Sequence, residues 1–240
     1  MSNAAGLRLG GWTPLSTTDY PGRLSAVLFC QGCPWSCVYC HNPHLIPADA
    51  PPQREWSAIL EFLRRRDGLL DAIVFSGGEP TLQPGLADAM REVRRLRFRI
   101  GLHTAGAYPE RLAEVLPLVD WVGFDVKAPF ERYDRINGVP GSGAKARESL
   151  RLLIESGVDH ECRTTVHPSL FDAPQLAALS ESLFAAGARR HVLQAFRAAG
   201  CRDEALSAAA NAAATTRLLE QAAALSPRVE RRGGVSIAQA

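Results

Sequence analysis

The chain has 240 residues, of which 46% are hydrophobic and 22% are charged, and its formal net charge is +2. This length and this balance indicate a folded globular protein with a substantial core. The small net charge gives no reason to expect nucleic acid as a partner, and no apolar run approaches the roughly 20 residues of a membrane helix.

Residues 1–22 form a turn-rich lead. Its first ten residues, MSNAAGLRLG, lack the basic and apolar regions of a secretory signal, so we expect a cytoplasmic protein. Disulfides are rare in that reducing compartment. The cysteines that cluster at residues 30–40 are therefore expected to be metal ligands or catalytic groups rather than cross-links.

Short apolar runs then alternate with helical patterns along the chain. Runs such as LSAVLF and DAIVFS have the length of buried strands, and the segments between them carry apolar residues at helical spacing. We expect strands at 24–29, 71–76, 97–104, 119–127, 159–168 and 189–196. Helices are expected at 54–66, 84–96, 109–118, 143–157, 173–187 and, in the alanine-rich tail, 203–225.

Six strand–helix units predict an α/β fold with parallel strands and right-handed crossovers. An open doubly wound sheet fits this pattern, and so does a partial (βα)6 TIM-like barrel, whereas a closed barrel needs eight units. We expect one domain over residues 1–240, with a helical tail at 203–240 that covers the barrel. In all these folds the ligand lies at the carboxyl ends of the strands.

The polar and reactive residues gather at those strand ends. A cysteine loop follows the first strand, the segment SGGEP follows the second, and HTAG ends the third. The fourth strand ends in DVK and the fifth in RTTVHP. These five segments are therefore expected to meet at one edge of the sheet.

The cysteine loop contains Cys33, Cys37 and Cys40 in the spacing C-x-x-x-C-x-x-C. A structural zinc site takes four ligands, usually as two separated pairs, but Cys30 belongs to the strand and His41 is too close to Cys40 to share one ion. A redox C-x-x-C motif is a weaker interpretation, because no helix opens at the pair. A [4Fe–4S] cluster held by three thiolates fits better, and it leaves one iron open for chemistry.

This motif, with Tyr39 just before the third cysteine, resembles the signature of the radical S-adenosylmethionine (SAM) superfamily. The segment from Ser76 through Gly77 and Gly78 to Glu79 resembles the part of those proteins that binds the amino group of SAM. Glycines let a backbone approach a ligand closely. The resemblance implies that Glu79 is the negative partner of the SAM ammonium.

A narrower resemblance extends over most of the chain, in the segments DYPGR, YCHNP, FSGGEPTLQPGL, DWVGFDVKAP, YDRINGV, RTTVHPSL and LQAFRAAGC. They are similar to the activating proteins of anaerobic ribonucleoside-triphosphate reductase, which belong with the glycyl-radical-enzyme activases. The resemblance implies a [4Fe–4S] cluster and SAM as cofactors. Its implied SAM contacts are Thr104, Asp125, Lys127, Arg163 and, as further candidates, His167 and Gln194.

Two positions depart from the pattern of the activases. Cys30 stands where they more often have Thr, Ser or Leu, so we expect a small buried residue there. Asp125 would also touch a bound monovalent cation, but His103 stands where activases often carry an aspartate before Thr104, which weakens the case for that cation.

The resemblance implies reductive cleavage of SAM and formation of a glycyl radical on a partner reductase. The electron would come from a flavodoxin- or ferredoxin-type donor. Apart from the resemblance, the candidates for a partner surface are Trp35, Tyr133 and the basic runs at 64–66 and 94–99, although solvated helix faces are the preferred interpretation of those two runs. One alternative is a radical SAM enzyme with a small-molecule substrate, such as a 7-carboxy-7-deazaguanine synthase. The other is a metal-binding scaffold protein without catalysis.

Overall fold

The computed structural model describes residues 4–233, so residues 1–3 of the predicted lead and residues 234–240 of the predicted tail lie outside the described part. Within it, eight strands form one sheet whose spatial order follows the sequence from β1 to β8. The strands are β1 (Leu9–Ser16), β2 (Ser25–Cys30), β3 (Ala72–Gly77), β4 (Arg99–Thr104), β5 (Trp121–Asp125), β6 (Asp159–Val166), β7 (His191–Ala195) and β8 (Glu230–Arg232).

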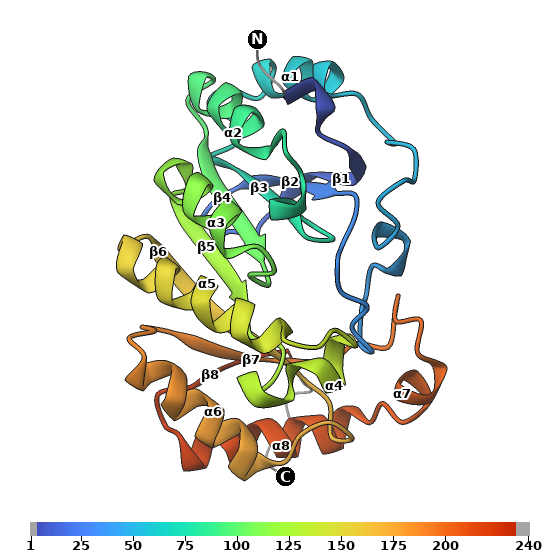
Figure 1. Cartoon of the computed structure of the whole chain (residues 1–240), viewed down its shortest axis with the longest axis vertical. Coiled ribbons are helices and arrows are strands. Elements are labelled where there is room, and N and C mark those ends of the chain that lie inside the picture. Colours follow the sequence, from blue (N-terminus) through green and yellow to red (C-terminus); the bar gives the residue numbers. More distant parts are fainter. Residues whose placement is uncertain (1–3, 234–240) are drawn as a thin grey trace.

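All neighbouring strands from β2 to β8 are parallel, and β1 pairs antiparallel with β2. Because the strand order never reverses, the sheet has no switch point of the doubly wound kind. The six predicted strands correspond to β2 through β7. The predicted partial (βα)6 barrel is therefore confirmed, and the doubly wound alternative is wrong (Figure 1).

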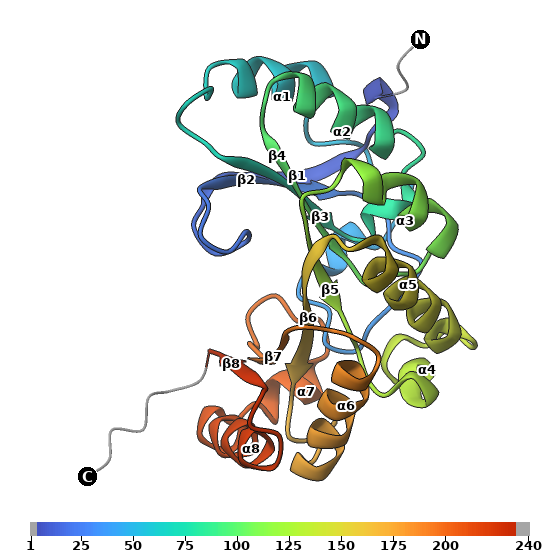
Figure 2. The ribbon, with the colours of Figure 1, turned by 90° about the vertical axis from the view of Figure 1, so that its left-hand side faces the viewer.

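The helices between the strands cover one side of the curved sheet. Figure 2 shows α3, α5 and α6 on that side and the β1–β2 connection on the other. The helices are α1 (Trp56–Arg64), α2 (Leu86–Arg95), α3 (Pro109–Val115), α4 (Tyr133–Asn137), α5 (Ser142–Ser156), α6 (Ala173–Ala185), α7 (Glu204–Ala208) and α8 (Ala212–Leu225). Short 3₁₀ helices are η1 (Ala4–Gly6), η2 (Pro43–Leu45), η3 (Pro80–Leu82), η4 (Leu116–Leu118) and η5 (Phe130–Arg132).

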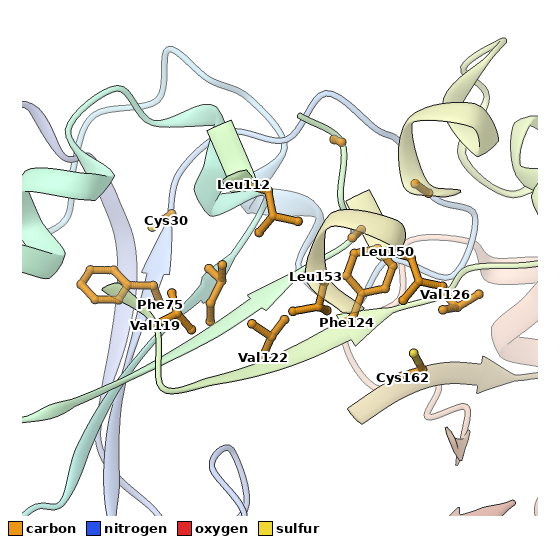
Figure 3. Packing of buried hydrophobic residues seen from close by; sticks show 14 of the residues in the cluster. Cys30, Phe75, Leu112, Val119, Val122, Phe124, Val126, Leu150, Leu153 and Cys162 are labelled. Carbon is orange, nitrogen blue, oxygen red and sulfur yellow. The ribbon is translucent and has the colours of Figure 1, made fainter. Parts of the chain in front are cut away.

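Successive side chains of each strand point to opposite faces of the sheet, so the buried side chains form two groups. Val122 and Phe124 of β5 pack with Leu150 and Leu153 of α5 in the larger core, between sheet and helices (Figure 3). A smaller cluster fills the inside of the barrel and consists of Tyr20, Val27, Ala72, Val74 and Trp121. The barrel is thus filled at one end, which leaves space at the carboxyl ends of its strands.

Besides the short 3₁₀ helices, two strands and one α-helix of the described residues were not predicted. β1 contains Gly10, Gly11 and Pro14, all poor strand residues, yet it pairs with β2 over most of its length. A Cβ on Gly10 would lie 2.1 Å from the Gln31 side chain, so glycine permits this close approach. The five-residue α4 and the three-residue β8 are too short to give a periodic pattern.

The tail predicted as one helix over 203–225 is two helices. α7 ends at Ala208, and the side chain of Asn211 then accepts a hydrogen bond from the Ala214 N–H and caps α8. α8 packs against α6 and β7. Among the helices of residues 4–233, none has the length and apolar character needed to cross a membrane.

Candidate functional site

The loop that carries the three cysteines is held by backbone hydrogen bonds at both of its ends. At its base, Gly32 N–H donates to the Leu45 carbonyl (2.7 Å) and Cys33 N–H to the Ile46 carbonyl (3.1 Å). Farther out, Ser36 and Val38 donate to carbonyls of α4, at 3.2 and 2.9 Å. The loop therefore has a defined conformation that does not depend on its thiols, and α4 is part of its support.

Cys33, Cys37 and Cys40 line one cavity of about 220 Å³ at the carboxyl ends of the strands, and all three are free thiols. Nineteen residues line it: Cys33, Trp35, Cys37, Tyr39, Cys40, His41, Asn42, Ile46, Ser76, Gly77, Gly78, His103, Thr104, Ala105, Asp125, Lys127, Arg163, Thr165 and Gln194. The structure thus brings together the three predicted metal ligands and eight of the ten predicted cofactor contacts.

The chemistry of this donor set fits an iron–sulfur group. Burial raises the pKa of Cys33 to about 12 and also raises that of Cys37, so both are protonated thiols near neutral pH until a metal displaces the proton. Across residues 4–233, no three His, Cys, Asp or Glu side chains are placed to hold a single metal ion. Thiolates that bind three separate irons of one cluster need not meet at a point.

The other three cysteines lie away from the cavity lining. Cys30 and Cys162 are fully buried in the core between sheet and helices, where Figure 3 shows them beside apolar side chains. The expectation that Cys30 is a small buried residue is confirmed. Cys201 is half-buried and its thiol lies 3.6 Å from the Val38 carbonyl of the cysteine loop.

Gly77 and Gly78 let the end of β3 lie directly against the cysteine loop. Gly78 N–H donates to the Cys30 carbonyl (2.9 Å), and the next N–H donates to the Gly32 carbonyl (2.9 Å). Gly77 has φ +117°, a conformation that favours glycine, and a Cβ there would lie 2.4 Å from Cys30 N. The two glycines are thus required by chain packing as well as by any ligand.

Gly78→Ala tests this packing. Its Cβ would lie 2.2 Å from the Gly32 carbonyl oxygen, so backbone must move, and we expect a loss of about 1–3 kcal/mol in the free energy of unfolding. Gly11→Ala is the matched control, because its nearest contact would be 3.6 Å away. Urea denaturation of both variants makes the comparison, and equal stability of the two would contradict the packing described here.

Glu79 does not take its predicted place beside a ligand. Its carboxylate accepts four hydrogen bonds from the protein, from Thr81 N–H and O–H, Thr104 O–H and Ala105 N–H, at 2.7–3.1 Å. It is buried and is not among the cavity-lining residues. In this arrangement Glu79 joins the ends of β3 and β4, and its pairing with the SAM ammonium stays a prediction.

Lys127 and Asp125 form an ion pair on the cavity wall, with Nζ 2.9 Å from Oδ2. Burial opposes ionisation of both, but the neighbouring charges prevail: the pKa of Asp125 is lowered and that of Lys127 is raised. The backbone of Lys127 is fixed by two tyrosines, since its carbonyl accepts from the Tyr39 hydroxyl (3.1 Å) and its N–H donates to that of Tyr133 (3.0 Å). The pair therefore stays charged at neutral pH in one position.

His103 lies deeper in the same cavity. Its Nε2 is 2.8 Å from the Asp19 carbonyl and its Nδ1 is 3.2 Å from the Ser76 hydroxyl. Burial, and then the charge of Arg163, lower its pKa to about 4, so the ring is neutral at pH 7. A tautomer with the proton on Nε2 satisfies both hydrogen bonds.

Arg163 reaches the cavity from β6 and is fixed from behind by Glu161. Its Nε lies 2.8 Å from Glu161 Oε1. The Glu161 carboxylate is completely buried and also meets Arg232 of β8, at 2.8 and 3.1 Å, with Arg190 at 3.8 Å. This cluster of charges links β6 to β8 below the cavity.

Two predicted contacts lie elsewhere. His167 is fully buried outside the cavity lining, where its Nδ1 accepts from Ser169 N–H (3.1 Å) and its ring packs edge-on against Phe196. Its predicted contact with the cofactor is thus not reflected in this lining and stays a prediction. Trp35 and Tyr133 are also buried, and they pack against each other, so they are not part of an exposed partner surface.

The segment from Phe196 to Asp203 lies against the cysteine loop, which sequence reasoning did not predict. His41 Nε2 is 2.7 Å from the Arg197 carbonyl and its ring packs on Phe196. A Cβ on Gly200 would lie 2.6 Å from the His41 carbonyl oxygen. The only sequence signal was the fragment LQAFRAAGC, which has no periodic pattern.

A second cavity of about 560 Å³ adjoins the first. His41, His103, Arg163, Thr165 and Gln194 line both. Its other walls come from the β1–β2 connection, the end of β7, α8 and β8, so it opens on the side of the barrel where the sheet is not closed. A molecule in this second cavity would therefore face the cysteine loop.

Comparison with known proteins adds to this geometry. The family profile described as the Radical SAM superfamily matches residues 27–175. A protein of Methanocaldococcus jannaschii, provisionally named a glycyl-radical enzyme activating enzyme, is 33% identical over 186 residues, 73% of this chain and 75% of its own. The pyruvate formate-lyase-activating enzyme of Clostridium pasteurianum is 28% identical over 67% of this chain and 69% of its own length.

A further relative, the 7-carboxy-7-deazaguanine synthase of Thermococcus kodakarensis, is 28% identical over 57% of this chain and 61% of its own. Among solved structures, SuiB of Streptococcus suis bound to S-adenosylmethionine matches 86% of this chain with TM-score 0.66 and 13% identity. The match spans about half of SuiB (49%). QueE of Escherichia coli matches 94% of this chain and 93% of its own, with TM-score 0.56 and 16% identity.

Proposed function

Because the chain belongs to the radical SAM superfamily, we propose that it is an activase that generates a glycyl radical on a partner enzyme, anaerobic ribonucleoside-triphosphate reductase. The superfamily uses a [4Fe–4S] cluster and SAM, and the chain is a radical SAM enzyme. The observation that carries the proposal is the single cavity lined by Cys33, Cys37 and Cys40, with no further cysteine among the described residues that line it.

Cys33, Cys37 and Cys40 would hold the cluster, and the fourth iron would remain for SAM. When bound and reduced, the cluster with SAM supplies one-electron cleavage of the C5′–S bond, which yields methionine and a 5′-deoxyadenosyl radical able to remove a hydrogen atom. The protein's part is to bind, to orient and to exclude water. The hydrogen bond from the buried Tyr39 to Lys127 and the segment from Phe196 to Asp203 cover the cysteine loop in this way.

The other cavity-lining residues would orient SAM. Asp125 and Lys127 on the cavity wall offer a carboxylate and an ammonium to the ribose and amino-acid groups of SAM. The backbone of Ser76, Gly77 and Gly78 offers carbonyls that can accept from its ammonium. Glu79 acts indirectly, by holding this turn against the end of β4.

The adjoining cavity of about 560 Å³ supports a substrate that enters from the open side of the barrel. A glycine of a protein loop suits such an entry, because it has no side chain to exclude and its α-carbon radical is delocalised over two peptide groups. Removal of one hydrogen atom from that carbon gives 5′-deoxyadenosine and the glycyl radical. No protein acid or base takes part in this transfer.

The experiment uses anaerobic protein reconstituted with iron and sulfide, then supplied with SAM and reduced flavodoxin or ferredoxin. We expect the electron paramagnetic resonance signal of a glycyl radical only when the reductase is added. Reductase made with α-deuterated glycine should transfer deuterium into 5′-deoxyadenosine. Formation of 5′-deoxyadenosine without radical or deuterium transfer would refute the reductase as substrate.

A second candidate is a radical SAM enzyme of the 7-carboxy-7-deazaguanine synthase kind. It is favoured by the similarity to the 7-carboxy-7-deazaguanine synthase of Thermococcus kodakarensis, which is 28% identical over 57% of this chain. That candidate predicts rapid 5′-deoxyadenosine turnover with a small-molecule substrate and no reductase present. In both cases thiolate ligands and a reduced cluster need a reducing compartment, so we propose that the protein acts in the cytoplasm.

A further inference from the structure

Thr165 of β6 and Gln194 of β7 lie side by side where the two cavities meet. They are register partners in the parallel ladder between these strands, and both line the cavity of about 220 Å³ as well as the cavity of about 560 Å³. Successive side chains of a strand point to opposite faces, and the preceding residues Thr164 and Leu193 are fully buried. The side chains of Thr165 and Gln194 therefore point into the barrel.

Neither of these two side chains is engaged within the protein. Among residues 4–233, no hydrogen bond joins the Thr165 hydroxyl or the Gln194 amide to another residue. The other three residues that line both cavities, His41, His103 and Arg163, each make a side-chain hydrogen bond to the protein. The hydroxyl and the amide are thus free to bind a ligand that spans the junction of the two cavities.

The chemistry of the two groups selects a neutral ligand that can both donate and accept. A charged ligand group is held best by an opposite charge, but the Gln194 amide accepts at its carbonyl and donates from its NH₂ without any charge. In an extended peptide, each residue directs its own N–H and C=O to the same side. One glutamine amide can therefore bind both groups of one residue, and the Thr165 hydroxyl can bind a neighbouring peptide group.

The place of this pair decides which atom of a bound peptide faces the cysteine loop. The smaller cavity is lined by Cys33, Cys37 and Cys40, and the larger one adjoins it. A peptide bound through its N–H and C=O keeps its Cα hydrogens free. If the bound residue is glycine, no side chain stands between its Cα and the smaller cavity.

We propose that Gln194 and Thr165 bind the peptide backbone of the substrate loop at its radical-bearing glycine, and so make the site specific for an extended polypeptide. The Gln194 amide accepts from the glycine N–H and donates to the glycine carbonyl. This role rests on the proposed function, and it gives Gln194 a contact with substrate in place of the SAM contact that the resemblance implies.

Two peptides test the proposal by equilibrium binding to the reconstituted protein at saturating SAM. One spans the radical glycine of the reductase, and the other has an ester oxygen in place of the glycine N–H. The unaltered protein should bind the amide about fivefold more tightly than the ester, as expected for one hydrogen bond. Gln194→Met should bind the amide about tenfold more weakly and bind the two peptides equally within about twofold, which is the result of a double-mutant cycle between interacting groups.

Two further variants complete the test. Thr165→Val should weaken both peptides alike by about threefold, because its hydroxyl serves a different peptide group. Gln221→Met, on the exposed face of α8 and in neither cavity, is the matched control and should bind both peptides as the unaltered protein does. Gln194→Leu repeats the measurement if the methionine variant does not fold.

The outcomes separate this role from the proposed function. A preference for the amide that survives in Gln194→Met would overturn the role of Gln194, even where the reductase acquires its glycyl radical. An unaltered protein that binds neither peptide, or binds both equally, would also overturn it. Radical formation on the intact reductase decides separately whether the proposed function stands.

Discussion

Cys37→Ser is expected to fold normally and to lose SAM cleavage. The loop around Cys37 is held by backbone hydrogen bonds to α4 and to the segment after η2, and none of these uses the thiol. A hydroxyl is a poor ligand for iron in place of a thiolate. We expect formation of 5′-deoxyadenosine to fall by more than about 100-fold, because even indirect partners of metal ligands are worth 10–100-fold.

Cys201→Ser is the matched control for this loss. Its thiol touches the same loop, 3.6 Å from the Val38 carbonyl, but does not line the cavity. We expect this variant to keep its full iron content and its activity. Cys37→Ser should lose iron but melt at the same temperature as the unaltered chain when both are free of the cluster. Wild-type cleavage by Cys37→Ser would contradict the assignment of the three thiols as ligands.

Glu161→Gln is expected to cause the largest loss of stability. Glu161 is completely buried and is the shared partner of Arg163, Arg190 and Arg232. Removing one member of a buried ion pair leaves the other charges without compensation, which costs about 3–5 kcal/mol. Urea denaturation measures the loss, and β8 should lose hydrogen-exchange protection first because Arg232 attaches it to β6.

Glu155→Gln provides the control, because Glu155 pairs with Arg151 on the exposed face of α5 and its side chain is 57% exposed. Exposed pairs of this kind contribute about 0–1 kcal/mol. Equal losses in the free energy of unfolding for Glu161→Gln and Glu155→Gln would show that the buried charge cluster does not stabilise the fold more than an exposed pair does.

The same carboxylate predicts a dependence of stability on pH. Burial raises its pKa, but the hydrogen bond from Arg232 and the charges of Arg163 and Arg232 outweigh it, so the pKa lies below the ordinary 4.5. The contribution of Glu161 is therefore complete above about pH 4.5 and is lost as the pH falls through its lower folded value. As the pH is lowered into the acidic range, the free energy of unfolding of Glu161→Gln should therefore fall less steeply than that of the unaltered chain.

Much of the fold was predictable because its signals are local. Apolar runs of strand length and helices with buried faces placed β2 through β7 within a few residues, and their alternation is what a parallel sheet requires. The elements that were missed depend on tertiary contacts. β1 needs the close approach that Gly10 allows, and β8 needs the pairing of its Arg232 with Glu161.

The candidate site was also predictable only in part. Motif spacing brought the three thiols and most of the polar residues to one cavity, because carboxyl ends of neighbouring parallel strands meet at one edge. Residue type alone could not show that Glu79 was already satisfied by Thr81, Thr104 and Ala105, or that His167 faces Phe196. Hydrogen-bond partners distant in sequence decide such questions.

Electron–nuclear double resonance of the reduced protein with SAM labelled by nitrogen-15 at its amino group and oxygen-17 at its carboxylate tests the central claim most directly. Three thiolate ligands leave one iron for SAM, so we predict that both labels couple magnetically to the cluster. A spectrum identical to that recorded with unlabelled SAM, as expected for a cluster with four protein ligands, would contradict the claim. Protein that holds only zinc would contradict it as well.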